Sequence, residues 1–235
     1  MEDLKHKIAH IIDHTLLKPD ATQQQIEVLC QEALENEFAS VCVLPYYVPL
    51  CSQILQNSLV KVCTVIGFPL GATLTEAKIA EAHSVLKNGA QELDMVLNIG
   101  ALKNGSFLYV QNEIDALAKK AHENGAILKV IIETCLLSEE EKLKACELVT
   151  NAGADFIKTS TGFSTGGATI EDVVLLKNHV GQNVRVKASG GIRDLKAAAA
   201  MIEAGAERLG TSSGVKIVRE HLSGEVESVI SKEQY

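Results

Sequence analysis

The sequence predicts an α/β fold, a single closed (β/α)8 barrel of the TIM type with a parallel eight-stranded core. Short apolar segments rich in β-branched residues alternate with longer amphipathic segments, which is typical of βαβ units and parallel sheets. The 235 residues divide into eight units of about 29 residues, close to the usual length of a barrel unit. A Gly-Ala pair also precedes four of the predicted strands, which indicates a weak internal repeat.

Eight segments have the length and composition of buried strands. Most are rich in valine, isoleucine or leucine, and amphipathic stretches separate them. The predicted strands are residues 8–13, 39–44, 60–66, 91–98, 127–133, 155–158, 184–188 and 207–210. Because a helical pattern follows each strand, we expect all eight to run parallel.

The segments between the strands begin with recognisable helix caps. In a capping box, a Ser or Thr and a Gln or Glu three residues later satisfy the first free amides of the helix. The pattern occurs at Thr22-Gln25, Thr73-Glu76 and Ser138-Glu141. We expect a helix to start at each of these boxes.

Glycines that precede strands indicate where the helices end. A glycine past a helix end adopts a left-handed conformation that turns the chain back toward the sheet. The Gly-Ala pairs begin at Gly89, Gly125, Gly153 and Gly205. An open doubly wound sheet is the alternative, but it usually carries G-x-G-x-x-G after its first strand, and that motif is absent. We therefore expect one domain over residues 1–235, with a short flexible tail at about 224–235.

The composition argues against large charged partners and against membranes. The net charge is -8 and the pI is near 5.4, whereas nucleic-acid and membrane surfaces need excess Lys and Arg. Residues 1–12 show no signal-peptide pattern, and no apolar run has membrane-spanning length. The six cysteines form no C-x-x-C pair and mostly lie in apolar runs. We expect a reduced, cytoplasmic protein.

Polar residues at strand ends mark the expected site, because barrel active sites form at the C-terminal ends of strands. Lys158 and Lys187 end the sixth and seventh predicted strands, and Asp94 interrupts the fourth. One such lysine alone is more simply a paired core charge or a solvated strand end. Two on neighbouring strands, with an aspartate nearby, favour catalysis. We interpret Lys129, near the start of its strand, as structural and away from the active face.

Two adjacent lysines suit amine catalysis. A lysine with a pKa near 10.4 is an ammonium at neutral pH and cannot attack a carbonyl. A second ammonium at about 4 Å opposes the charged form by about 4 kcal/mol at an effective dielectric near 20. One lysine can then be the nucleophile and the other its activator. Attack on an aldehyde gives an iminium, which serves as an electron sink without a metal.

Glycine-rich turns after the last three strands predict a phosphate site. Gly190 and Gly191 follow the seventh strand, and residues 210–214 (GTSSG) follow the eighth. Barrels frequently bind phosphate there through backbone amides. Gly162, after the sixth strand, can contribute. The alternative is a set of ordinary tight turns.

Two other patterns have simpler explanations. His6, His10 and His14 are spaced by four, which on one helix would suggest a metal site. Residues 11–15 look instead like a strand and its exit, and a strand would not gather the three on one side. Cys42, near the end of the second strand, is interpreted as a packing residue.

Four segments give the sequence a family resemblance. They are residues 13–19 (DHTLLKP), 92–96 (ELDMV), 156–162 (FIKTSTG) and 186–193 (VKASGGIR). Through these segments the chain resembles deoxyribose-phosphate aldolases, and the resemblance extends over nearly its whole length. The resemblance implies a cytoplasmic class I aldolase without a cofactor, and a homodimer. It would interconvert 2-deoxy-D-ribose 5-phosphate with glyceraldehyde 3-phosphate and acetaldehyde.

The resemblance also implies a role for each matching residue. Lys158 would form the Schiff base with the C1 aldehyde, Lys187 would lower the pKa of Lys158, and Asp94 would move protons through a water. Residues implied in binding the phosphate are Gly190, Gly191, Gly210, Ser212 and Ser213; those near the sugar are Asp13, Thr15 and Thr159. Some relatives have a lysine at the position of Phe163, so phosphate binding here would depend more on Arg193 and backbone amides.

The end of the chain and two rival functions stay open at this point. Residues 231–235 (SKEQY) end in a lone aromatic, Tyr235. Either this tail is disordered, or, as in some relatives that end in tyrosine, its phenol helps to move the C2 proton. The rival functions are another phosphosugar barrel enzyme, such as an isomerase, and a non-catalytic barrel that binds a phosphorylated ligand.

Overall fold

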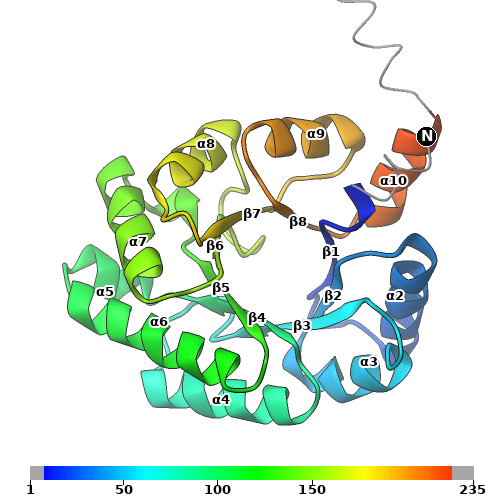
Figure 1. The fold of residues 1–235 in the computed structure, drawn as a ribbon, viewed down its shortest axis with the longest axis horizontal. Helices are drawn as coiled ribbons and strands as arrows, with labels where there is room; N and C mark the ends of the chain where they lie inside the picture. Colours follow the sequence, from blue (N-terminus) through cyan, green and yellow to red (C-terminus); the bar gives the residue numbers. More distant parts are fainter. Residues whose placement is uncertain (1–7, 224–235) are drawn as a thin grey trace, which may run out of the picture.

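Eight parallel strands form a closed barrel in the computed structural model, which describes residues 8–223. Every strand pairs with its sequence neighbours, and β1 pairs with β8 to close the ring. The strands are β1 (Ile12–Leu16), β2 (Ser40–Val43), β3 (Lys61–Ile66), β4 (Glu92–Val96), β5 (Ile127–Ile131), β6 (Phe156–Lys158), β7 (Arg185–Ser189) and β8 (Arg208–Thr211). Figure 1 looks into this ring. The predicted fold class is confirmed.

Helices surround the strands as an outer layer (Figure 1). The α-helices are α2 (Gln23–Asn36), α3 (Val48–Ile54), α4 (Thr75–Lys87), α5 (Ile99–Lys103), α6 (Phe107–His122), α7 (Glu139–Asn151), α8 (Ile170–His179), α9 (Leu195–Glu203) and α10 (Gly214–Ser223). Two short 3-10 helices, η1 (Pro45–Tyr47) and η2 (Thr134–Leu136), follow β2 and β5. Within residues 8–223, no helix combines the length and the apolar character needed to cross a bilayer.

Two of the three predicted capping boxes are confirmed. Thr22 caps α2 and Ser138 caps α7, each with the reciprocal side-chain bond of a full box. The box at Thr73 is wrong, because α4 begins at Thr75 and its cap residue makes no side-chain hydrogen bond. The Thr75 hydroxyl instead donates to the Glu113 carboxylate, at 3.1 Å, and lies within hydrogen-bonding distance of the Tyr109 hydroxyl, at 3.2 Å, both on α6. Tertiary contacts, not a local cap, therefore hold this helix start.

The Gly-Ala junctions have the predicted backbone. The φ angles are +103° at Gly89, +68° at Gly125, +72° at Gly153 and +108° at Gly205. These values lie in the region that side chains disfavour and glycine adopts freely. The four junctions therefore return the chain from a helix to the next strand in the same way.

The first strand begins later than predicted. Ile8 and Ala9 lie in a helical turn, and the strand starts at Ile12. Both early residues are buried, and a short apolar run does not distinguish a helix from a strand. The strand as observed includes both Asp13 and Thr15. Their side chains lie on the same face of the sheet, because residues two apart in a strand share a face. That face is the barrel interior, where Asp13 meets Lys187.

The apolar core lies between the strands and the helices, whereas the barrel interior is strongly charged. Fully buried side chains with charged ends include Lys129 and Lys187. At the start of β6, the Phe156 ring packs against the guanidinium groups of Arg185 and Arg208, whose central carbons lie 4.0 and 5.5 Å from the ring centroid. A charged interior is costly unless every charge is paired, so these residues mark the candidate site.

Candidate active site

Seven charged side chains from six strands meet inside the barrel. Three are carboxylates and four are cations: Asp13, Glu92, Asp94, Lys129, Lys158, Lys187 and Arg208. All are mostly or fully buried. Since buried charges are stable when paired and hydrogen-bonded, the cluster depends on the contacts among its own members.

Asp94 on β4 is the centre of this cluster. Its Oδ2 accepts hydrogen bonds from Nζ of Lys158 at 2.7 Å and from Nζ of Lys187 at 2.6 Å. Its Oδ1 accepts from Nζ of Lys129 at 2.8 Å and from the Cys63 thiol at 3.2 Å. Burial alone would raise the pKa of Asp94, but the three ammonium groups outweigh it and hold that pKa well below its usual range. Asp94 is therefore an anion at neutral pH.

Lys158 and Lys187 differ in depth. The Lys158 side chain, at the end of β6, is 4% exposed and lines an open cavity. Lys187 is fully buried and also donates to the Asp13 carboxylate. Burial alone would lower the pKa of Lys187, but Asp13 and Asp94 outweigh it and raise that pKa above its ordinary value. Lys187 is thus a fixed cation, and Lys158 is the amine that faces the cavity.

Lys129 belongs to the same cluster, so the prediction of a structural position away from the active face is wrong. The register makes Lys129 the direct partner of Asp94 on the neighbouring strand, so both lie at the same level in the barrel. Its Nζ lies 2.6 Å from a Glu92 oxygen and 3.3 Å from an Asp13 oxygen. The strand order along the chain did not reveal this level, because the stagger between barrel strands is not visible in one sequence.

Asp13 is fully buried and does not line the cavity, although the family resemblance implies a position near the sugar. Its Oδ1 accepts from the Ser40 hydroxyl at 2.7 Å and from the Arg208 guanidinium at 2.6 Å. Burial would raise the pKa of Asp13, but Lys129, Lys187 and Arg208 outweigh it and lower that pKa. Asp13 therefore orients Lys187 from beneath.

The cavity that Lys158 lines has a volume of about 260 Å³, and its other lining residues come from the ends of β1, β7 and β8 and from the segments after β1, β6, β7 and β8. Eight predicted site residues line it: Thr15, Lys158, Gly162, Gly190, Gly191, Arg193, Gly210 and Ser212. The φ angles of Gly162, Gly190 and Gly191 are +84°, +82° and +84°. Glycine adopts such angles freely, and its missing side chain leaves the backbone amides accessible to a ligand.

The other predicted binding residues lie outside this cavity. Thr159 is buried, and its hydroxyl joins β6 to β7 by donating to the Ser189 carbonyl at 3.2 Å and accepting from the Ser189 amide at 3.1 Å. Ser213 lies at the start of α10 and lines a neighbouring cavity with His14 and Glu32. Tyr235 lies outside the described residues.

Phe163, which lines the cavity, forms an aromatic pair with Phe68, which is not among the lining residues. The rings of Phe68 and Phe163 meet edge to face, with centroids 5.3 Å apart. Phe163 lines the cavity and is 51% exposed. Phe68 was not singled out from the sequence, because a loop phenylalanine gives no signal of its position near a distant strand.

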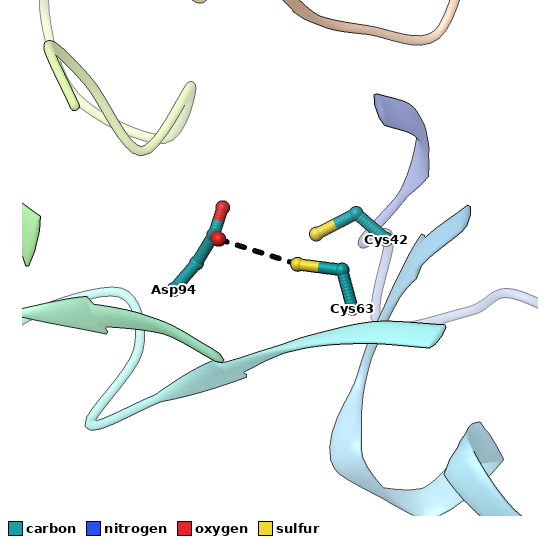
Figure 2. A group of neighbouring side chains, drawn as sticks. All are labelled: Cys42, Cys63 and Asp94. Carbon is teal, nitrogen blue, oxygen red and sulfur yellow. Dashed lines mark hydrogen bonds between the residues drawn. The ribbon is translucent and has the colours of Figure 1, made fainter. Parts of the chain in front are cut away.

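Cys42, Cys63 and Asp94 come from three consecutive strands and point toward one another, as Figure 2 shows. Their ligand atoms lie within 4.8 Å of one another, a spacing compatible with a metal ion. However, Nζ of Lys129 contacts both the Cys63 sulfur, at 3.1 Å, and the Asp94 carboxylate. Burial raises the pKa of the Cys63 thiol, whereas a metal ligand must be a thiolate. The geometry favours the predicted packing role of Cys42.

His14 is engaged in a local contact. Its Nε2 lies 2.7 Å from a Glu32 oxygen on α2, and its ring packs 5.0 Å from that of Phe38. The His14 side chain therefore holds β1 against α2. Of the other two histidines in the pattern, His10 lies 3.9 Å from a Glu37 oxygen, and His6 lies outside the described residues.

Comparisons with known proteins show the family of this chain. Residues 7–223 match the sequence profile described as DeoC/LacD family aldolase. Deoxyribose-phosphate aldolase of Brevibacillus brevis is 62% identical over 207 residues, covering 88% of this chain and 93% of that protein. The corresponding protein of Thermococcus gammatolerans is 61% identical over 213 residues, covering 90% and 95%.

A solved structure supports the same assignment. The tetrameric deoxyribose phosphate aldolase of Aeropyrum pernix superposes with a TM-score of 0.87 at 37% identity, covering 93% of this chain and 92% of that one. The profile match and the sequence identities each extend over most of the chain. The chain belongs to the DeoC/LacD family of aldolases.

Proposed function

We propose that the protein reversibly cleaves 2-deoxy-D-ribose 5-phosphate to glyceraldehyde 3-phosphate and acetaldehyde through a Schiff base on Lys158. The observation that carries the proposal is the position of Lys158: its amine lines the cavity and shares one Asp94 oxygen with Lys187. A nucleophilic amine needs access to the substrate and a neighbour that disfavours its protonated form. The fold and the sequences of relatives support the same reaction.

Charge balance in the barrel favours Lys158 as the nucleophile. Four cations face three carboxylates in the cluster, so a neutral amine at one lysine balances the charges. Lys129 and Lys187 each contact more than one carboxylate, whereas Lys158 contacts Asp94 alone among the described ion pairs. Lys158 is therefore the lysine with the fewest carboxylate partners. Its neutral amine has the lone pair that attacks a carbonyl in the proposed reaction.

The reaction starts when the Lys158 amine adds to the C1 aldehyde of the open-chain sugar. Loss of water gives an iminium, with Asp94 moving protons through a water molecule. A base then takes the proton of the C3 hydroxyl, and the C2–C3 bond breaks as its electron pair moves toward the iminium nitrogen. Glyceraldehyde 3-phosphate leaves, and an enamine stays on Lys158.

Protonation of the enamine at C2 and hydrolysis of the resulting iminium release acetaldehyde and restore Lys158. Tyr235 remains a proposed proton carrier for C2. It is tested by comparing the exchange of acetaldehyde methyl protons with deuterated solvent in the parent and in Tyr235→Phe. If Tyr235 carries this proton, the exchange should be slower in the variant, whereas Lys158 should still form a Schiff base.

The phosphate group is proposed to bind where the loops after β7 and β8 meet. Gly190, Gly191, Gly210 and Ser212 line that side of the cavity, with Arg193 at its edge. Backbone amides in such loops bind anions without a large positive field. That arrangement suits a chain whose net charge is -8.

Borohydride reduction in the presence of acetaldehyde tests the proposal. A Schiff base on Lys158 is reduced to a stable amine, and peptide mass spectrometry locates the added mass. Lys158→Ala should lose both this mass and turnover, whereas Lys18→Ala, which removes another amine at the cavity, should keep the mass on Lys158. An isomerase or a non-catalytic barrel would gain no such mass. Modification chiefly at another lysine would contradict the assignment.

We further propose a homodimer in the cytoplasm. Six free cysteines fit a reducing compartment such as the cytoplasm.

Exposed leucines are the proposed dimer contact. Leu70 and Leu74, just before α4, are 76% and 72% exposed, and Leu108 on α6 is also 72% exposed. The hydrogen bond between Thr75 and Tyr109 brings these two segments together. Light scattering should give twice the chain mass, and Leu74→Glu should lower it; a monomeric parent would refute this assembly.

A further inference from the structure

Glu133, two residues past the end of β5, combines a buried carboxylate with an unfavourable backbone conformation. Its φ and ψ are 55° and 65°, in the left-handed region that residues with a side chain rarely adopt. The side chain is buried, and within residues 8–223 no lysine or arginine pairs with it. A buried carboxylate needs donors, so the contacts that it does make should matter.

Both carboxylate oxygens of Glu133 bind Thr161, in the segment after β6. Oε1 accepts from the Thr161 backbone N–H at 3.1 Å, and Oε2 accepts from the Thr161 hydroxyl at 2.5 Å. The hydroxyl oxygen in turn accepts from the backbone N–H of Phe163 at 3.0 Å. The amide of Thr134 donates to the Thr159 carbonyl at 2.9 Å. The exit of β5 therefore fixes the exit of β6.

The fixed segment is a wall of the cavity. Thr161, Gly162 and Phe163 line it together with Lys158 and Gly190. A Cβ atom placed on Gly190 would lie 3.8 Å from the Gly162 Cα and 3.0 Å from the Gly167 Cα. The loops after β6 and β7 are therefore packed backbone to backbone. A shift of Thr161 would move Gly162, and with it the space beside Gly190.

We propose that Glu133 is a positioning residue for substrate binding: its carboxylate holds the Thr161–Gly162 turn so that the phosphate end of the substrate fits against Gly190. This inference rests on the proposed function and assigns it a further residue. Glu133 does not line the cavity, so its effect passes through Thr161.

Two substitutions at Thr161 test the hydroxyl contact. Thr161→Val keeps the shape and removes the hydroxyl, and we expect the KM for 2-deoxy-D-ribose 5-phosphate to rise about tenfold, as for loss of a hydrogen bond to a charged group. The KM for unphosphorylated 2-deoxyribose and the borohydride trapping at Lys158 should change much less. Thr161→Ser retains the hydroxyl and should restore the parent KM. A parent-like KM in Thr161→Val would overturn the proposal.

Glu133→Gly separates the carboxylate from the backbone conformation, because glycine adopts the same φ without strain. We expect a rise in KM at least as large as in Thr161→Val, because Glu133→Gly also removes the bond to the Thr161 backbone N–H. The double variant should show little further rise over Glu133→Gly, since both changes remove the same hydroxyl–carboxylate bond. A parent KM in Glu133→Gly would show that conformation alone matters, and additive effects in the double variant would show independent roles. Either result contradicts the proposal.

A matched control is available at Glu37, where another glutamate has a φ of 56° at the end of α2. Glu37 lines a cavity with Lys61 at the opposite, N-terminal ends of the strands. Glu37→Gly should therefore leave both KM values unchanged. If Glu133→Gly does not fold, the Thr161 pair decides alone. A parent that neither cleaves the sugar nor forms a Schiff base would refute the proposed function, whereas an active parent with unaffected variants would refute only the role of Glu133.

Discussion

The barrel register makes Lys158 on β6 the direct partner of Lys187 on β7. Side chains at paired positions of adjacent parallel strands point to the same face, so both ammonium groups enter the barrel interior. They reach the same Asp94 oxygen, at 2.7 and 2.6 Å. Two like charges this close oppose each other, and the shared carboxylate offsets part of that repulsion. The catalytic state of Lys158 should therefore respond to any change at Lys187.

Lys187→Leu should lower turnover by about 100-fold or more, in the range found for loss of a positioned proton-transfer group. In the proposed mechanism the Lys187 ammonium disfavours the protonated form of its neighbour Lys158, and the variant lacks this repulsion. The residual pH–rate profile should therefore shift toward alkaline pH, and borohydride trapping at neutral pH should weaken. Lys61→Leu, at the start of β3, serves as a control outside the interior cluster. A near-parent rate with an unshifted profile would make Lys187 structural.

The buried carboxylates should make the fold sensitive to acid. Burial raises the pKa of Asp13 and of Asp94, but neighbouring cations outweigh it and lower both. A group with a lowered folded pKa stabilises the fold above its unfolded pKa, near 3.9 for aspartate, and loses that contribution as the pH falls toward the folded value. The free energy of unfolding should therefore fall as pH decreases below about 4.

Urea unfolding between about pH 5 and pH 2 measures this dependence. Each such carboxylate adds a slope of up to about 1.4 kcal/mol per pH unit. Asp13→Asn removes one titrating group and should flatten the slope, although the variant is less stable at neutral pH because Lys187 and Arg208 lose a partner. Asp115→Asn, in an exposed pair with Lys119, should leave the slope unchanged. Equal slopes in all three proteins would contradict the assignment of ionised buried aspartates.

Residues at strand ends could be predicted from the sequence, whereas residues that depend on register could not. Lys158 ends β6, as predicted, whereas Lys187 lies in the middle of β7, two residues before its end. Both are late in their predicted strands, which was enough to expect them near the active end of a barrel. Lys129 is early in the predicted strand 127–133 and was therefore expected to be remote, but it is the middle residue of β5 and the register pairs it with Asp94. Stagger between neighbouring strands is a property of the closed sheet and leaves no local signal in the chain.

Contacts between loops were equally invisible in the sequence. Glu133 and Thr161 are 28 positions apart and belong to different βα units. Neither the left-handed backbone of a glutamate nor its bond to a threonine follows from propensity, because glycine or asparagine is the usual residue there. The glycines at 190 and 191 were predictable, since double glycine after a late strand is itself the signal.

Gly190→Ala should weaken phosphate binding selectively. The Gly190 backbone has a φ of +82°, and an added Cβ would lie 3.0 Å from the Gly167 Cα, so the loop must shift. We expect the KM for the phosphorylated sugar to rise about tenfold or more, the effect of roughly 1.4 kcal/mol, with a small change for unphosphorylated deoxyribose. Gly153→Ala controls for the cost of positive φ, because its Cβ meets nothing within 4 Å. Equal losses for both substrates would remove the phosphate role.

Turnover should survive exhaustive treatment with EDTA. In the proposed reaction the iminium on Lys158 is the electron sink, so no metal ion is needed. In the group of Cys42, Cys63 and Asp94, the Lys129 ammonium contacts both Cys63 and Asp94. The measurement is the cleavage rate before and after chelation and dialysis. Loss of activity that a divalent ion restores would count against the Schiff-base mechanism.

Phe163→Lys should strengthen binding of the phosphorylated sugar. Phe163 lines the cavity, is half exposed and lies edge to face against Phe68. A lysine can therefore replace its ring and extend into solvent without disrupting a buried core. A lysine ammonium about 4 Å from the phosphate would contribute about 1 kcal/mol in a solvent-like dielectric, which corresponds to a roughly fivefold lower KM.

The gain should shrink as ionic strength rises, because salt screens an exposed charge pair. Phe163→Gln removes the ring without adding a charge and separates the two effects: its KM for the phosphorylated sugar should stay at or above the parent value. For unphosphorylated deoxyribose, the lysine and glutamine variants should behave alike. If the lysine variant improves both sugars equally, the mouth of the cavity at Phe163 acts on the sugar itself, and the phosphate lies elsewhere.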